Sequence, residues 1–144
     1  MSIVEVKNLS TQYFTEGGIV RAVESISLKL RRGSIIGLAG ESGSGKSTLA
    51  LSIMKLLPGN GEIVQGEIIF VGLNIVEMSE SEIRKKIRWS IISMVFQGAL
   101  NALNPLHRIG DQIAEPIILH KGISTDNSNN QNCPVNYLAP SKPY

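Results

Sequence analysis

Gly40-Glu41-Ser42-Gly43-Ser44-Gly45-Lys46-Ser47 is the stretch of this sequence that decides the fold. It satisfies the pattern G-x-x-x-x-G-K-[ST] of a phosphate-binding loop, or P-loop. Its glycines allow backbone conformations that are closed to other residues, so the main chain can curl round an anion. Successive amide N–H groups then point inward at the positive end of the helix that follows. The stretch therefore predicts a site for the phosphates of a nucleotide.

Three side chains at the end of this loop have predicted roles. Lys46 brings a full positive charge to the β- and γ-phosphates, and the Ser47 hydroxyl can ligate Mg²⁺. Thr48 is placed to donate to the α-phosphate. The loop residues predicted to bind ATP are Gly40, Ser42, Gly43, Ser44, Gly45, Lys46, Ser47 and Thr48. The alternative is an ordinary glycine-rich turn before a helix.

The segments on either side of the loop supply the context that a P-loop needs. Residues 34–39 are almost wholly apolar, which is typical of a strand covered on both faces in a parallel sheet. A helix is expected over residues 46–57, where Pro58-Gly59 ends it. Residues 91–96 form another run typical of a buried strand. Together they predict an α/β fold with a P-loop core.

The residues before the loop predict an antiparallel β layer. Residues 3–6 favour a strand, and residues 21–30 show the period-2 alternation of a half-buried strand. Gly17-Gly18 lies between them as a turn, and residues 66–71 are another strand candidate. Further on, Ser79-Glu80-Ser81-Glu82 is a capping box that should begin a helix reaching about Trp89.

Composition limits the possible functions. The chain has 144 residues, enough for one modest domain, and a net charge of +2 from 14 basic and 12 acidic residues. This balance argues against a nucleic-acid partner. Cys133 is the only cysteine, so a disulfide framework is excluded. No apolar run approaches the roughly 18–20 residues that span a bilayer, so a membrane connection would go through partner proteins.

The amino-acid composition of the sequence changes after Ile123. The following residues are rich in Asn and Pro and have almost no apolar periodicity. Such a segment buries too little apolar surface to offset the entropy lost on ordering it. The predicted organisation is therefore a domain over residues 1–123 and a disordered or non-homologous tail over 124–144.

A P-loop by itself indicates only that a nucleoside triphosphate or a similar phosphate ligand binds. A GTPase of the Ras type would need an Asn-Lys-x-Asp motif, and the chain contains no Asn-Lys pair. A small-molecule kinase remains open on the loop alone.

Several segments in order resemble the ATP-binding subunits of ABC transporters, and within them the oligopeptide/dipeptide importer branch. The strand pair ahead of the loop and the loop itself through Thr48 are similar to the family pattern. Residues 92–97 resemble the strand that leads into the family's glutamine loop. Leu103-Asn104-Pro105 and residues 110–116 are typical of the peptide importers. The resemblance covers about residues 1–123.

The resemblance implies two further site residues. Tyr13 matches the aromatic residue that stacks on adenine, a role that suits a flat ring, with Phe14 as the fallback. Gln97 matches the glutamine that contacts Mg²⁺ or the attacking water, and it is the catalytic candidate. Its neutral amide can offer an oxygen to a metal and donate to a phosphate or water. Ser47 and Gln97 are thus the expected Mg²⁺ ligands.

Other parts of the family pattern do not occur in this sequence. They are the apolar strand ending in Asp-Glu, the Leu-Ser-Gly-Gly-Gln signature, and the switch histidine, for which His107 and His120 stand too early. Glu115 lies in a loop-like setting and is a poor general base. Because hydrolysis needs a group that orients water, we expect this truncated or frame-disrupted ABC ATPase domain to be inactive alone.

Two functional classes follow. In the first, the chain is an ATP-binding subunit energising peptide import at the cytoplasmic face of the cell membrane. Its partners would be transmembrane permease subunits, a second ATP-binding subunit and, indirectly, a peptide-binding protein. Residues 98–105 would help to meet the permease. The second class is a non-transport P-loop protein, such as a small kinase or a DNA-metabolism ATPase.

Overall fold

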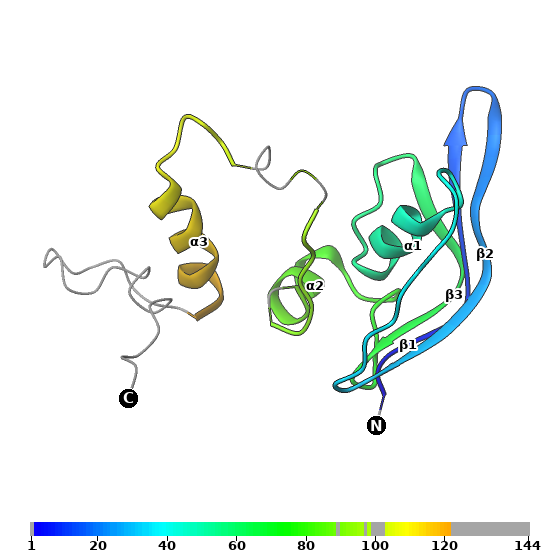
Figure 1. The fold of residues 1–144 in the computed structure, drawn as a ribbon, viewed down its shortest axis with the longest axis horizontal. Coiled ribbons are helices and arrows are strands. Elements are labelled where there is room, and N and C mark those ends of the chain that lie inside the picture. Colours follow the sequence, from blue (N-terminus) through cyan, green and yellow to red (C-terminus); the bar gives the residue numbers. More distant parts are fainter. Residues whose placement is uncertain (1, 89, 97, 99–102, 122–144) are drawn as a thin grey trace, which may run out of the picture. The chain divides into compact units, whose positions relative to one another are not determined.

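The structure is a computed structural model that describes residues 2–88, 90–96, 98 and 103–121. In chain order its elements are β1 (Ser2–Thr15), β2 (Gly18–Arg31), α1 (Lys46–Ile53), β3 (Gly61–Phe70), β4 (Leu73–Asn74), α2 (Glu80–Lys86) and α3 (Ile109–Lys121) (Figure 1). The chain divides into two compact units, residues 1–84 and 85–144. The predicted tail, residues 124–144, and Gln97 lie outside the described residues. Within the described part, no helix has the length and apolar character needed to cross a bilayer.

The first unit is built on a four-stranded antiparallel sheet in the order β2-β1-β3-β4. β1 and β2 form a long hairpin whose turn falls at Glu16-Gly17, so the predicted turn and the antiparallel layer are confirmed. β1 is much longer than the run over residues 3–6 suggested, since it continues through Tyr13. The buried hydrophobic residues of this unit include Val6, Leu9, Leu49, Ile68, Phe70, Ile75 and Ile83.

A β-bulge at Asn8 changes which side chains of β1 face the core. Val4 and Val6 are buried, and beyond the bulge the buried positions include Leu9 and Thr11. The pairing with β3 shifts by one residue between Lys7 and Ser10, as an extra residue in β1 requires. Without the extra residue, strict alternation along β1 would point Leu9 and Thr11 away from the face on which Val4 and Val6 are buried.

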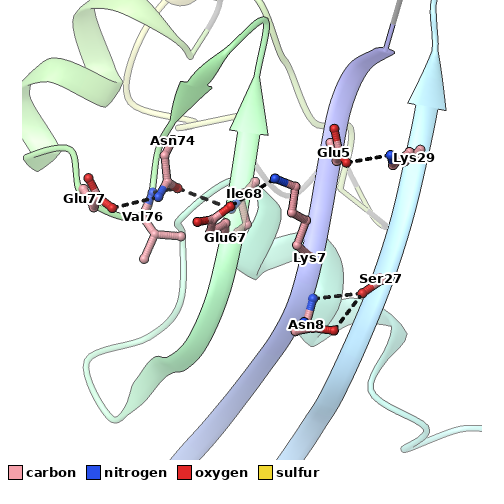
Figure 2. Close-up of polar contacts among 10 residues, drawn as sticks. All are labelled: Glu5, Lys7, Asn8, Ser27, Lys29, Glu67, Ile68, Asn74, Val76 and Glu77. Atoms are coloured by element: carbon pink, nitrogen blue, oxygen red, sulfur yellow. Dashed lines mark hydrogen bonds and ion pairs between the residues drawn. The ribbon is translucent and has the colours of Figure 1, made fainter.

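Two neighbours hold this bulge. Asn8 has a φ of 47°, its amide N–H donates to Ser27 Oγ at 2.9 Å, and Ser27 Oγ donates to Asn8 Oδ1 at 3.3 Å (Figure 2). Gly66 on β3 lies against the bulge with a φ of 99°. A Cβ at Gly66 would come within 2.6 Å of the Asn8 carbonyl oxygen and the Leu9 Cα. The bulge therefore depends on the absence of a side chain at position 66.

Helix α1 packs on the sheet through a buried chain of hydroxyl groups. Ser52 Oγ donates to the Thr48 carbonyl at 2.7 Å and lies 2.9 Å from Thr11 Oγ1 on β1. Because the Ser52 hydroxyl has one hydrogen, Thr11 is the donor in the second bond. The helix ends at Ile53, earlier than the predicted Leu57.

Lys55 marks this early helix end. It has a φ of 50°, outside the helical range. Its ammonium donates to the carbonyl oxygens of Ile75, Val76 and Met78 at 3.3, 2.8 and 2.7 Å. The segment between β4 and α2 is thereby tied to the end of α1.

The two predicted parallel strands do not form, so this part of the sequence-based prediction is wrong for the structure. Residues 34–40 have no regular structure, and Ile35 is 97% exposed. In the second segment Ile92 makes only an isolated parallel bridge to Arg88. A strand of a parallel sheet needs a neighbour for its backbone groups and a layer on each face. The described residues provide neither for residues 34–39.

The predicted helix after the capping box is present as α2, shorter than expected. The Ser79 amide donates to Glu82 Oε2 at 3.1 Å, and the Glu82 amide donates to Ser79 Oγ at 3.4 Å. The capping box is therefore confirmed. In the second unit, α3 runs through Glu115 and Pro116, which the sequence had suggested as a loop. Proline fits the helical φ, so it costs the helix one hydrogen bond without necessarily ending it.

An ion pair across β1 and β2 alters the acidity of one carboxyl group. Lys29 Nζ lies 2.7 Å from Glu5 Oε1 (Figure 2). This hydrogen bond from Lys29 holds the pKa of Glu5 below its ordinary value, and the positive charges of Lys29 and Lys7 act in the same direction. Desolvation opposes the shift without cancelling it.

Replacing Lys29 by methionine is expected to raise the pKa of Glu5 toward its ordinary value. Since the folded-state pKa of Glu5 is lowered, the pair stabilises the fold above the unfolded-state pKa and loses that contribution as pH falls through the folded-state pKa. A carboxyl-detected NMR titration of Glu5 measures the change. Lys7→Met is the control and should move the Glu5 pKa less. Equal titration of Glu5 in wild type and Lys29→Met would contradict the assignment.

Candidate functional site

The predicted P-loop leads directly into α1, which begins at Lys46. Lys46 is half-buried as a residue, and its ammonium folds back onto the loop. It donates to the carbonyl oxygen of Gly40 at 2.7 Å, to that of Glu41, and to Ser44 Oγ at 3.0 Å. All three acceptors are neutral oxygens of the loop, so a phosphate group would offer the ammonium a stronger, charged partner.

The loop rests directly on the main chain of β2. Gly45 has a φ of 87°, and a Cβ on it would lie 2.2 Å from the Ala22 carbonyl oxygen. Only a residue without a side chain allows this approach. The contact brings the β1–β2 hairpin against the loop, and with it the side chains near the hairpin's tip.

Tyr13 is one of these side chains. Its hydroxyl donates to Thr48 Oγ1 at 3.3 Å, and a Cβ on Gly61 would lie 2.7 Å from the ring atom Cε1. Gly61 therefore leaves room for the ring, and Thr48 holds its hydroxyl end. Since Thr48 Oγ1 accepts this bond, its own hydrogen remains able to point to a phosphate oxygen.

The loop and the hairpin enclose one cavity of about 610 Å³. Pockets for small molecules and cofactors measure roughly 300–1,000 Å³, so the volume suits a nucleotide. The cavity is lined by Tyr13, Val20, Arg21, Ala22, Ser42, Gly43, Ser44, Gly45, Lys46, Ser47 and Thr48. Tyr13 and most of the predicted loop residues are thus brought together. Phe14, the fallback aromatic residue, is not among the lining residues and is 45% exposed.

Three lining residues, Val20, Arg21 and Ala22, were missed by the sequence-based prediction. They lie on β2, where Val20 pairs with Tyr13 and Arg21 pairs with Gln12. The sequence shows that residues 21–30 form a strand but not which part of that strand meets the loop. The pairing register decides this, and it depends on the bulges in β1.

The start of α1 suits an anionic ligand. Its first turn contains no acidic residue, and Gly45 at the N-cap makes no side-chain hydrogen bond to the helix. The first amide N–H groups of a helix lack intrahelical acceptors and carry partial positive charge. The donor set here, with Lys46, therefore fits the phosphates of ATP. Ser47 is exposed next to them, where its hydroxyl could reach Mg²⁺ held by those phosphates.

One predicted site residue that the structure describes, Gly40, is not among the cavity-lining residues. Gly40 contributes through its carbonyl oxygen, which accepts from Lys46. Gln97 lies outside the described residues, so its predicted roles toward Mg²⁺ and water stay predictions.

The Leu-Asn-Pro step of the second unit forms a turn held by one side chain. Gln112 Oε1 accepts from the Asn104 amide at 2.8 Å. Gln112 Nε2 donates to the carbonyl oxygens of Asn104 at 2.9 Å and His107 at 3.0 Å. Leu106, inside this turn, is 90% exposed.

Comparison with known proteins agrees with these features. The dipeptide transport ATP-binding protein DppD of Lactococcus lactis is 44% identical over 123 residues, which is 85% of this chain and 35% of that protein. The oligopeptide transport ATP-binding protein OppD of Haemophilus influenzae is 45% identical over 120 residues, 83% of this chain and 36% of that protein. The chain thus spans about a third of the length of these relatives.

A solved structure is similar in fold. The ATP-binding cassette MJ0796, in a dimeric post-hydrolysis state bound to ADP and Pi, superposes with a TM-score of 0.71. It shares 23% sequence identity, and the match covers 94% of this chain and 54% of that one. The predicted fold class, an ABC ATPase cassette with an N-terminal antiparallel layer, is confirmed at this level. The family described as ABC transporter matches residues 23–136, which is most of the sequence. The chain belongs to the ABC transporter family.

Proposed function

We propose that this chain binds ATP with Mg²⁺ as part of an ATP-binding subunit that energises oligopeptide or dipeptide import. The observation that carries the proposal is a cavity lined by both Tyr13 and the P-loop. An aromatic ring at one end and a phosphate loop with Lys46 at the other match the two ends of ATP. The bound metal neutralises phosphate charge, and here Ser47 would hold it.

The assignment to peptide transport is supported by the relatives, which are named as dipeptide and oligopeptide transport ATP-binding proteins. These relatives do not favour the non-transport alternatives, a small kinase or a DNA-metabolism ATPase. The proposed partners are transmembrane permease subunits, a second ATP-binding subunit and, indirectly, a peptide-binding protein. The proposed location is the cytoplasmic face of the membrane, reached through the permease.

The division of the chain and its catalytic competence belong to the same proposal. Residues 1–123 would be the N-terminal part of an ABC ATP-binding domain and residues 124–144 a separate tail, although the family match continues to residue 136. Gln97 would contact Mg²⁺ or the attacking water. The sequence printed for the chain contains neither an apolar strand ending in Asp-Glu nor a Leu-Ser-Gly-Gly-Gln signature. We therefore expect these 144 residues to bind ATP without hydrolysing it.

Tyr13→Ala is expected to weaken Mg-ATP binding about tenfold, because stacking of a base on an aromatic ring contributes roughly 1–3 kcal/mol. Tyr13→Phe keeps the ring and loses only the hydrogen bond to Thr48, so it should retain most of the affinity. Isothermal titration calorimetry of the full chain with Mg-ATP measures both. Phe14→Ala is the matched control and should bind like wild type. Failure of the wild-type chain to bind Mg-ATP would overturn the proposed function, whereas a loss in Phe14→Ala alone would reassign the stacking residue.

A further inference from the structure

Arg21 lies on β2 between two residues that also line the cavity. Its neighbour Val20 pairs with Tyr13 across the hairpin, and its other neighbour Ala22 carries the carbonyl that touches Gly45. Arg21 itself lines the cavity. A side chain at this position is therefore next to the point where a nucleotide would pass from its base to its phosphates.

The charged residues known to line the cavity are both positive. Among its lining residues Arg21 and Lys46 are cationic, and none is a carboxylate. Lys46 is held at the loop by three acceptors. Arg21 Nη1, in contrast, lies 3.5 Å from Glu24 Oε1, and both side chains are 67% exposed.

The ion pair with Glu24 is weak enough that Arg21 can exchange it for another anion. Exposed pairs contribute about 0–1 kcal/mol, and this one is near the outer limit of hydrogen-bond length. A phosphate carries more charge than a carboxylate and offers oxygens that match the fork of a guanidinium. Exchange of Glu24 for a phosphate oxygen would thus be favourable.

We propose that Arg21 is a second cationic ligand of the bound nucleotide and contacts its phosphates on the ribose side. This inference rests on the proposed function, since it assigns an additional residue to the same nucleotide site. Lys46 reaches the β- and γ-phosphates from the loop. Arg21 approaches from β2 and discriminates nucleotides that carry phosphates from nucleosides that do not.

The test compares Arg21→Gln with wild type for Mg-ATP, Mg-ADP and adenosine, using calorimetry on the full chain. The affinities for Mg-ATP and Mg-ADP should fall about five- to tenfold, by similar factors, while the affinity for adenosine stays unchanged. Raising the salt concentration should weaken Mg-ATP binding less in the variant, because one charge contact is missing. Arg32→Gln is the matched control: Arg32 is exposed in the turn after β2 and does not line the cavity, so its variant should bind like wild type.

The outcomes separate this inference from the proposed function. Unchanged Mg-ATP affinity in Arg21→Gln, with wild-type binding intact, overturns the role of Arg21 and leaves the proposed function standing. An equal loss for adenosine also overturns it, since the contact would then be to the base or ribose. Absence of Mg-ATP binding in wild type overturns both. Glu24→Gln frees Arg21 and should tighten Mg-ATP binding by about twofold; weaker binding in that variant would count against the inference.

Discussion

Lys46→Ala is expected to abolish the stabilisation of this chain by Mg-ATP. In wild type, Mg-ATP at a hundred times its Kd should add about 2.7 kcal/mol to the free energy of unfolding, a shift of several degrees in Tm. The ammonium lies against the P-loop, where it donates to the Gly40 and Glu41 carbonyl oxygens and to Ser44 Oγ. Its removal takes away the positive charge that the loop itself would bring to the β- and γ-phosphates.

The measurement is thermal unfolding with and without Mg-ATP. Lys46→Ala also loses the three hydrogen bonds within the loop, so its Tm without nucleotide should fall slightly. The relevant readout is therefore the shift caused by Mg-ATP within each variant. Lys7→Ala is the control, because Lys7 is a surface lysine paired with Glu67 at 3.3 Å and lies outside the cavity. An undiminished shift in Lys46→Ala would show that the loop is not the phosphate site.

Gly66→Ala is expected to destabilise the first unit by about 2–4 kcal/mol. A φ of 99° is strained for alanine, which costs on the order of 1–3 kcal/mol. The added Cβ would also lie 2.6 Å from backbone atoms of Lys7, Asn8 and Leu9, and backbone cannot rotate away as a flexible side chain can. Displacing the bulge would disturb the phase of β1 and hence the position of Tyr13, so Mg-ATP affinity should fall as well.

Urea unfolding of the full chain measures this loss. Gly72→Ala is the matched control: Gly72 has a φ of 87°, but nothing lies within 4 Å of the Cβ it would gain. The control should show backbone strain alone, about 1 kcal/mol at this site. Equal losses in the two variants would mean that the close approach of Gly66 to the bulge contributes nothing.

The features predicted correctly from the sequence are local ones. The helix that begins directly after the loop from Gly40 to Gly45, the capping box of Ser79 and Glu82, and the hairpin turn beside Gly18 each involve residues close in the chain. Their hydrogen bonds and backbone angles depend on the residue types in a short window. For the same reason most of the loop residues singled out from the sequence are found together at the cavity.

The errors concern elements that need distant partners. Residues 34–39 and 91–96 have the composition of buried strands, yet composition does not supply the neighbouring strands that would pair with them. The β-favouring residues from Thr11 to Thr15 are consistent with the extension of β1 through Tyr13. That run lacks the simple alternation of residues 21–30, so its pattern alone does not predict a strand.

The sequence by itself determined that a glycine-rich loop precedes a helix, that an antiparallel hairpin lies ahead of it, and that the chain resembles the ABC transporter family. Only the tertiary structure decided that Tyr13 turns toward Thr48 and that Arg21 borders the same cavity. The physical reason is the set of register shifts along β1. One of them is the bulge at Asn8, which Gly66 and Ser27 accommodate. Such a shift arises from contacts between strands far apart in the chain, so no local pattern of residues encodes it.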